Sequence, residues 1–257
     1  MIYSTQGKEH LNPKYSNAVK IAIFGENSII DFEQADYGIG NHNIIYLDRY
    51  SRFSSFLERL KICNNNINFF SKIRERVLKN PLRKKFCAAV ISNFHITDYF
   101  RLEFIKKLNL YKKVDMGGKF NNNVGGPVPN KIQFLSFYKF SIAMENTSGD
   151  GYSSEKIIDS FLSGTIPIYY GNFMVEEYIN RKTYILIKGQ EDIYKKIKYI
   201  KEIDNNDDLY KKILKENVII EENIVKKFEK EKSDFLIHIF EQDKELAKRK
   251  YIEILNI

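Results

Sequence analysis

Two basic residues stand where a cation is unfavourable for a helix but favourable for a bound anion. Lys156 falls in the first turn of a helix predicted after Ser153-Ser154-Glu155, and Arg101 in the first turn of a helix predicted from Tyr99. The amino end of a helix carries a partial positive charge and free N–H groups, so it suits a phosphate. For Lys156 the pattern favours a bound phosphate over a solvated side chain, whereas Arg101 taken alone favours an ordinary surface position.

The segment around Lys156 predicts a strand, a polar loop, a helix and a second strand in succession. Tyr138 to Met144 alternate in the strand period, Glu145 to Tyr152 are mostly polar and contain glycines, and Ile166 to Tyr170 are apolar. Ser153 and Ser154 offer hydroxyls to cap the helix, whose apolar face comprises Ile157, Ile158, Phe161 and Leu162. Such a segment belongs to a parallel sheet, and its loop lies at the carboxyl end of a strand, where α/β folds bind ligands.

The rest of the chain repeats the α/β pattern. Further strands are predicted at Ile21–Phe24, Asp36–Gly40, Phe86–Ile91, Val114–Met116 and Tyr184–Ile187. Further helices are predicted at Phe56–Val77 with a break at Asn64–Asn66, at Tyr99–Leu108, after Asn130, at Val175–Ile179, at Glu191–Ile203 and, in two pieces, at Leu209–Phe240. A basic linker at Lys79–Lys85 marks a boundary. We expect domains at 1–80 and 81–205, with carboxyl-terminal helices at 206–257 packing on them.

Composition indicates a basic protein without structural metal or disulfides. The net charge is +8 and the pI about 9.1, which reflects either attraction to anions or a sequence rich in Lys, Asn and Ile together. The chain has no arginine-rich arm, so nucleic acid is not expected as a partner. The two cysteines and four histidines lack the spacing of a zinc site or a disulfide framework, which fits a reducing compartment.

The sequence predicts a cytoplasmic protein. No run approaches the roughly 18 apolar residues of a membrane span, and the amino terminus lacks the apolar core of a signal peptide. From about Lys211 onward the chain is basic and amphipathic, which allows peripheral contact with an anionic membrane, at the inner face of the cytoplasmic membrane. A solvated helical face with mixed charges is the favoured alternative.

Several motifs occur in a fixed order along the chain. The central one runs Met144-Glu145-Asn146, a loop to Tyr152, Ser154-Glu155-Lys156, then Ile166-Pro167-Ile168-Tyr169-Tyr170-Gly171. The others are Gly25-Glu26-Asn27, Asp36–Gly40 with Asp48-Arg49-Tyr50, and Phe134-Leu135-Ser136. Together they resemble the α1,3-fucosyltransferases of glycosyltransferase family 10 over about residues 20 to 190. The resemblance implies a GT-B-like α/β fold of two Rossmann-like domains with parallel sheets.

The resemblance also implies an activity. Members of the family move L-fucose from GDP-fucose to a sugar hydroxyl with inversion of the anomeric centre. The expected acceptor is a glycan or glycolipid, and the expected product an α1,3 linkage on a bacterial surface polysaccharide. No cofactor is implied and no metal site is evident in the sequence, while dependence on a divalent metal stays open.

Individual residues acquire roles from the resemblance. Lys156 and Arg101 match the family's diphosphate-binding cations, which a diphosphate leaving group needs most in the transition state. Glu26 matches the glutamate proposed as general base, although by itself it is an ordinary loop glutamate. Glu145 is balanced between a structural role in its own loop and a functional one. The remaining donor-binding positions are matched by Asn146, Tyr152 and Glu155.

The amino-terminal part departs from the family's pattern. A complete Rossmann-like domain takes roughly 100 to 150 residues, yet about 85 precede Phe86. We therefore expect the first domain to be incomplete. Two alternatives stay open beside the fucosyltransferase: a truncated family member that binds the nucleotide with weak or no catalysis, and a transferase that uses a different nucleotide sugar.

Overall fold

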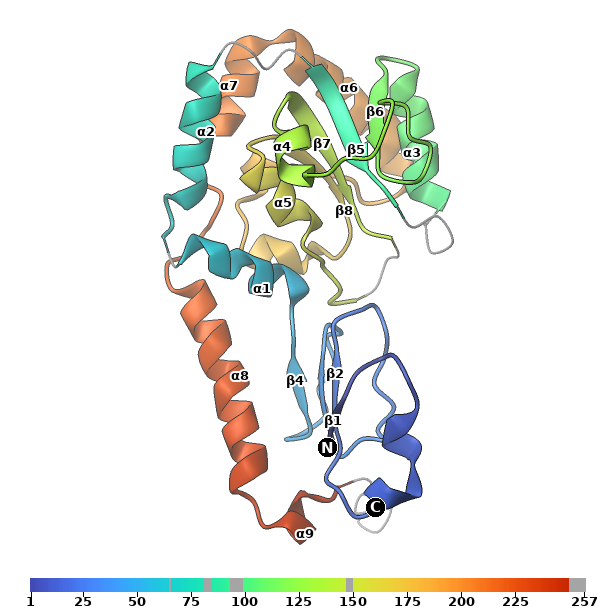
Figure 1. Cartoon of the computed structure of the whole chain (residues 1–257). Coiled ribbons are helices and arrows are strands. Elements are labelled where there is room, and N and C mark those ends of the chain that lie inside the picture. Colours follow the sequence, from blue (N-terminus) through green and yellow to red (C-terminus); the bar gives the residue numbers. More distant parts are fainter. Residues whose placement is uncertain (65, 81–84, 93–98, 147–149, 250–257) are drawn as a thin grey trace. The chain divides into compact units, whose positions relative to one another are not determined.

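The computed structural model describes residues 1–64, 66–80, 85–92, 99–146 and 150–249. The described residues pack into two compact units, each built on its own parallel sheet (Figure 1). Unit 1 contains those of Met1–Glu58, Gly149–Tyr152 and Asn223–Ile257, and unit 2 those of Arg59–Ser148 and Ser153–Glu222. The predicted α/β fold with two parallel sheets is confirmed, and the domain boundaries near residues 80 and 205 stay a prediction.

The described part of unit 1 holds a four-stranded parallel sheet in the order β1-β2-β3-β4. The predicted strands at 21–24 and 36–40 are confirmed as β2 and β3. The sequence reading missed both edge strands, which are very short. The strands are β1 (Ile2–Tyr3), β2 (Ile21–Phe24), β3 (Tyr37–Gly40) and β4 (Tyr50–Arg52).

The carboxyl-terminal helices α8 (Ile224–Glu241) and α9 (Lys244–Ala247) supply apolar side chains to the core of unit 1. Ile239 and Ala247 are buried in one cluster with Ile21 and Tyr37 of the sheet. The ring of Tyr37 meets that of Phe235 edge to face at 6.2 Å. The amphipathic character of this region is thus used, on its apolar side, to cover the sheet.

The described part of unit 2 holds a five-stranded parallel sheet in the order β6-β5-β7-β8-β9. Its strands are β5 (Lys85–Val90), β6 (Val114–Gly117), β7 (Tyr138–Met144), β8 (Ile166–Tyr170) and β9 (Ile185–Leu186). Helix α1 (Ser55–Leu60) begins in unit 1 and ends in unit 2. The other helices of unit 2 are α2 (Phe69–Lys79), α3 (Tyr99–Asn109), α4 (Lys131–Leu135), α5 (Lys156–Leu162), α6 (Ile193–Asn205) and α7 (Asp207–Lys215). Five strands predicted from periodicity therefore occur within a few residues of their expected bounds.

Strand β7 occupies the centre of this sheet and of the unit's core. It pairs with β5 on one side and β8 on the other, with Phe140 opposite Ile166 and Met144 opposite Tyr170. Phe140 and Met144 are buried in one apolar cluster with residues of α3, α6 and α7. Because β7 is fixed on both sides, the residues that follow it begin from a rigid position.

Two helix predictions need correction in their details. The helix predicted at 175–179 is a 3-10 turn at Phe173–Glu177, opened by Asn172, whose side chain accepts the N–H of Met174 at 2.7 Å. The helix predicted at 191–203 starts with a 3-10 turn at Gln190–Asp192 before α6 begins at Ile193. In contrast, Asn130 caps α4 as expected, since its Oδ1 accepts the N–H of Gln133 at 3.0 Å. None of the helices that the structure describes is both long and apolar enough to cross a membrane.

The two cysteines lie buried in unit 2, each 1% exposed. Burial raises the pKa of the Cys63 thiol to about 12 and that of Cys87 well above its usual value. Because the thiolate is the reactive form, we expect neither thiol to react with maleimide in the native protein at about pH 8, and both to react after denaturation. Fast labelling of either cysteine in the folded state, followed by mass spectrometry, would contradict this burial.

Candidate functional site

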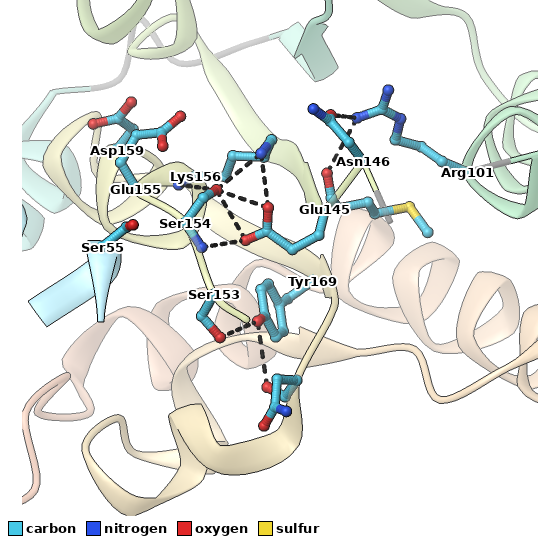
Figure 2. A network of polar contacts seen from close by, with 12 residues as sticks. Ser55, Arg101, Glu145, Asn146, Ser153, Ser154, Glu155, Lys156, Asp159 and Tyr169 are labelled. Atoms are coloured by element: carbon cyan, nitrogen blue, oxygen red, sulfur yellow. Dashed lines mark hydrogen bonds and ion pairs between the residues drawn. The ribbon is translucent and has the colours of Figure 1, made fainter. Parts of the chain in front are cut away.

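The carboxyl end of β7 and the start of α5 bring several of the predicted site residues together in unit 2 (Figure 2). Glu145 and Asn146 directly follow β7, and Ser154 and Glu155 directly precede Lys156, the first residue of α5. Residues 147–149 of the intervening loop lie outside the described part of the chain. These residues therefore lie at the carboxyl edge of a parallel sheet, which is where the sequence predicts the site and where α/β folds bind ligands.

Glu145 has a carboxylate that is completely buried and closely surrounded by donors. It accepts hydrogen bonds from the Ser154 N–H at 2.8 Å and from the Ser154 hydroxyl at 2.7 and 3.0 Å. The Lys156 ammonium forms an ion pair with Oε2 at 2.7 Å and also donates to the Ser154 hydroxyl at 2.8 Å. Lys156 therefore does not extend freely into solvent, since its side chain is only 19% exposed.

The predicted capping of α5 by Ser153 and Ser154 is wrong. The residue at the cap position is Glu155, which makes no capping bond with its side chain. The Ser154 hydroxyl approaches the Lys156 N–H only at 3.5 Å and is bonded to the Glu145 carboxylate instead. The Ser153 hydroxyl bonds the Tyr169 hydroxyl at 3.1 Å. The Ser154 hydroxyl thus donates its proton to the Glu145 carboxylate, while its oxygen accepts from the Lys156 ammonium at 2.8 Å, a charge-assisted bond that is shorter than its contact with the helix N–H.

Arg101 is 2% exposed, which corrects the surface position that the sequence alone favoured. Its NH1 donates to Asn146 Oδ1 at 2.8 Å and to the Met144 carbonyl at 3.3 Å. These bonds attach α3 to the end of β7 and explain how a guanidinium can be buried there. Arg101 and Asn146 thus lie together, directly beside the Glu145 that binds Lys156 (Figure 2).

Glu155 differs from its neighbours because its side chain is 48% exposed. Among the described residues, its ion-pair partner is the Lys131 ammonium, 4.0 Å from Oε1. That ammonium bonds more closely to Asp159 at 2.9 Å, and Arg59 binds the same carboxylate at 2.9 Å. The Glu155 carboxylate is therefore held only loosely by protein groups and is accessible at the start of α5.

Glu26 and Tyr152 belong to unit 1. Glu26 is exposed in the loop after β2, whose backbone is held by the fully buried Asn41. The Asn41 side-chain amide donates to the Phe24 and Glu26 carbonyls, both at 3.4 Å. Tyr152 is buried, and Gly151 before it has a φ of +88° and packs so tightly that a Cβ would lie 2.4 Å from the Asn41 carbonyl oxygen. Asn41 thus holds the loop of Glu26 through its side chain, and its carbonyl oxygen lies close against the backbone of Gly151.

The cluster in unit 2 can bind an anion with two cations that the protein holds in place. Arg101 and Lys156 each carry a positive charge, and each is fixed by a partner at 2.7–2.8 Å. Fixed donors of this kind stabilise charge that develops on a leaving group without having to reorganise. Within the described ranges, no group of three or more His, Cys, Asp or Glu residues could hold a metal ion.

Glu145 is the residue that the sequence reading left outside the site. The sequence placed it directly after a buried strand and before a polar loop, which is compatible with either of its two suggested roles. The missing information was its burial and the identity of its donors, because these depend on the return of the chain at Ser154 and Lys156. The sequence does contain one signal for this contact. Glu145 directly follows a buried strand and stands eleven residues before Lys156, a lysine at a helix start.

The two parallel-sheet units and the cationic edge of the second define the chain as a GT-B-like α/β protein. The family model "Glycosyltransferase family 10 (fucosyltransferase) C-term" matches residues 80–250, and that of the "Alpha-(1,3)-fucosyltransferase FucT N-terminal domain" matches residues 1–58. The chain therefore belongs to glycosyltransferase family 10. This confirms the resemblance seen in the sequence motifs.

Relatives and solved structures agree with this assignment. The chain is 32% identical over 230 residues to alpha-(1,3)-fucosyltransferase FucT of Helicobacter pylori, a match covering 79% of this chain and 48% of the relative. It thus spans about half the length of that relative. A crystal structure of an alpha1,3-fucosyltransferase with GDP-fucose has a TM-score of 0.76 at 29% identity, covering 90% of this chain and 77% of the other. The Anabaena protein HepE with UDP-glucose, at 8% identity and a TM-score of 0.51 over 87% of this chain and 72% of the other, shares the fold alone.

Gly171 follows β8 and leaves the space that Glu145 occupies. A Cβ at this position would lie 2.5 Å from the Tyr169 hydroxyl oxygen and 2.8 Å from Glu145 Cγ. We expect Gly171→Ala to destabilise the fold by about 1–3 kcal/mol, because both neighbours are buried and cannot move away. The free energy of unfolding in urea measures this. Gly126→Ala is the matched control, since a Cβ there meets nothing within 4 Å; an equal loss in both variants would contradict the expectation.

Proposed function

We propose that this chain is an inverting glycosyltransferase that moves L-fucose from GDP-fucose to a hydroxyl of a glycan acceptor, in α1,3 linkage. The observation that carries the proposal is the presence of two cations held by protein partners, the buried Arg101 and the partly exposed Lys156, beside the carboxyl end of β7 in a chain of family 10. The solved fucosyltransferase that resembles this chain was crystallised with GDP-fucose, which supports the same donor here.

In the proposed reaction the donor-binding residues lie in unit 2, except Tyr152, which belongs to unit 1. Lys156 and Arg101 bind the diphosphate of GDP-fucose and stabilise the negative charge that it gains as the bond to fucose breaks. Asn146 keeps the Arg101 guanidinium in place by accepting its hydrogen bond at 2.8 Å. The accessible Glu155 carboxylate and Tyr152 complete the proposed donor contacts, with Glu155 suited to the positive charge that develops on the sugar.

The proposed base is Glu26 of unit 1. Its carboxylate takes the proton from the acceptor hydroxyl as the hydroxyl oxygen attacks the anomeric carbon on the face opposite to GDP, which inverts that centre. The exposed position of Glu26 in the loop after β2 is compatible with access by a large acceptor. The proposed acceptor is a glycan or glycolipid of a bacterial surface polysaccharide, reached from a cytoplasmic location.

The proposed activity can be tested by incubating the protein with GDP-fucose and an N-acetyllactosamine-type acceptor. We expect a fucosylated product together with stoichiometric GDP, because displacement at the anomeric carbon couples the two. Parallel thermal-shift measurements with GDP, UDP and CDP sugars identify the donor. Absence of both product and GDP would contradict the proposal, a shift with GDP but no turnover would favour the nucleotide-binding alternative, and turnover with another nucleotide sugar would correct the donor.

Two substitutions separate donor binding from proton transfer. Lys156→Ala is expected to abolish the rise in Tm that GDP causes at a concentration near the wild-type Kd, because it removes a cation from the diphosphate site and so weakens binding. Glu26→Gln is expected to keep that rise but to lower kcat by about 10²–10⁴-fold, the usual contribution of a general base. Lys195→Ala and Glu33→Gln are matched controls, since both side chains are exposed and outside the proposed site. Full activity of Glu26→Gln would remove this glutamate from the mechanism.

A further inference from the structure

The buried carboxylate of Glu145 is bonded only by groups at the entrance of α5, as far as the described residues show. Its three kinds of donor are the Ser154 N–H, the Ser154 hydroxyl and the Lys156 ammonium, all at 2.7–3.0 Å. The Glu145 backbone N–H is bonded separately to the Tyr170 carbonyl at 2.8 Å, which fixes the residue to β8. The side chain thus connects a rigid strand end to the residue proposed to bind the diphosphate.

Because the Glu145 carboxylate is charged and buried, it requires a cation beside it. A fully buried carboxylate is strongly unfavourable unless a cation and hydrogen-bond donors compensate it. Lys156 is the cation that does so, at 2.7 Å from Oε2. The ammonium is therefore held near one position, although a lysine side chain otherwise samples many rotamers.

The geometry leaves the ammonium capable of binding a ligand. An ammonium group has three N–H donors. Glu145 Oε2 and the Ser154 hydroxyl accept two hydrogen bonds from Lys156, and the side chain remains 19% exposed. One donor thus remains beyond these two contacts, on a cation whose position is set before any ligand arrives.

The residues around Glu145 leave its side chain little room to move. A Cβ at position 171 would lie 2.8 Å from Glu145 Cγ, so the glycine leaves room for the glutamate side chain. The neighbouring Tyr169 is fully buried, and its hydroxyl is bonded to Ser153 at 3.1 Å and to the Asn172 carbonyl at 3.3 Å. These neighbours restrict the Glu145 side chain, so that the lysine is placed by a group that is itself fixed.

We propose that Glu145 is a positioning residue for Lys156: the buried carboxylate orients the ammonium that binds the diphosphate of the nucleotide sugar. This inference rests on the proposed function, in which Lys156 contacts that diphosphate. It assigns to Glu145 no contact with the substrate. It also predicts an effect whose sign is opposite to simple electrostatics, because removal of a negative charge near a diphosphate would by itself strengthen binding.

The decisive measurement is the affinity for GDP of the full chain, by isothermal titration calorimetry, with and without Glu145→Gln. We expect E145Q to bind GDP about tenfold more weakly and to have a lower kcat, the size of effect found when a group that orients a binding side chain is removed. In a Lys156→Met background the same substitution is expected to change GDP affinity by less than about twofold, because the two residues act as one unit. Unchanged or tighter GDP binding by E145Q, or an equal loss in both backgrounds, overturns the inference.

Controls separate positioning from stability. Asp204→Asn removes another buried carboxylate of unit 2, one paired with Lys112 and Lys139, and we expect it to lower Tm without changing GDP affinity. If E145Q does not fold, Glu145→Asp replaces it, since it keeps the charge but draws the carboxylate back from the Lys156 ammonium. Weaker GDP binding that disappears in the Lys156→Met background supports the inference, and unchanged binding or an equal loss in both backgrounds overturns it. Failure of the wild-type chain to bind GDP at all would instead reject the proposed donor, which distinguishes the two failures.

Discussion

The ion pair between Glu145 and Lys156 determines how the end of β7 meets the start of α5. The polar loop that connects the two segments would by itself allow many relative positions of the end of β7 and the start of α5. The buried carboxylate allows few arrangements, since it must keep a cation and two further donors within 3.0 Å. The serine that could cap the helix is used for the carboxylate instead, and the glycine after β8 is needed to leave room for it. Several local features that look independent in the sequence thus follow from one interaction.

The two units support their site residues by different means. In unit 2, β7 is central in the sheet, and the buried Arg101 and Glu145 both act at its carboxyl end. In unit 1, the connections from β2 to β3 and from β3 to β4 contain no helix, and a buried side-chain amide, that of Asn41, holds the loop of Glu26. Hydrogen bonds to one amide constrain a loop less than a buried ion pair with several donors does. The charged site residues of unit 2 are therefore held by stronger interactions than the loop of Glu26 in unit 1.

The sequence was sufficient for elements whose burial produces a strong local pattern. Strand β7 occurs with the predicted bounds because its residues alternate in the strand period, and β8 because a strand buried on both faces reads as an apolar run between turn residues. Strand β4 could not be predicted from Tyr50, Ser51 and Arg52, since it is a strand only by pairing with β3. The motifs predicted which residues belong to the candidate site, but not which atoms they contact. Arg101 appeared to be a surface residue and Ser154 a cap until tertiary partners, Met144 and Glu145, were known.

Stability alone does not explain why a charge pair is buried at this position. Replacing a buried ion pair by apolar side chains of similar volume is often neutral or favourable for folding, because the desolvation of two charges offsets their attraction. The same site could therefore pack an apolar pair between β7 and α5, as the rest of the sheet does with Phe140 and Ile166. An apolar pair would leave no ammonium at the edge of the sheet. A lysine without the carboxylate would leave the ammonium mobile. Only the combination gives a cation that is both charged and fixed, which is the property that binding of a diphosphate requires.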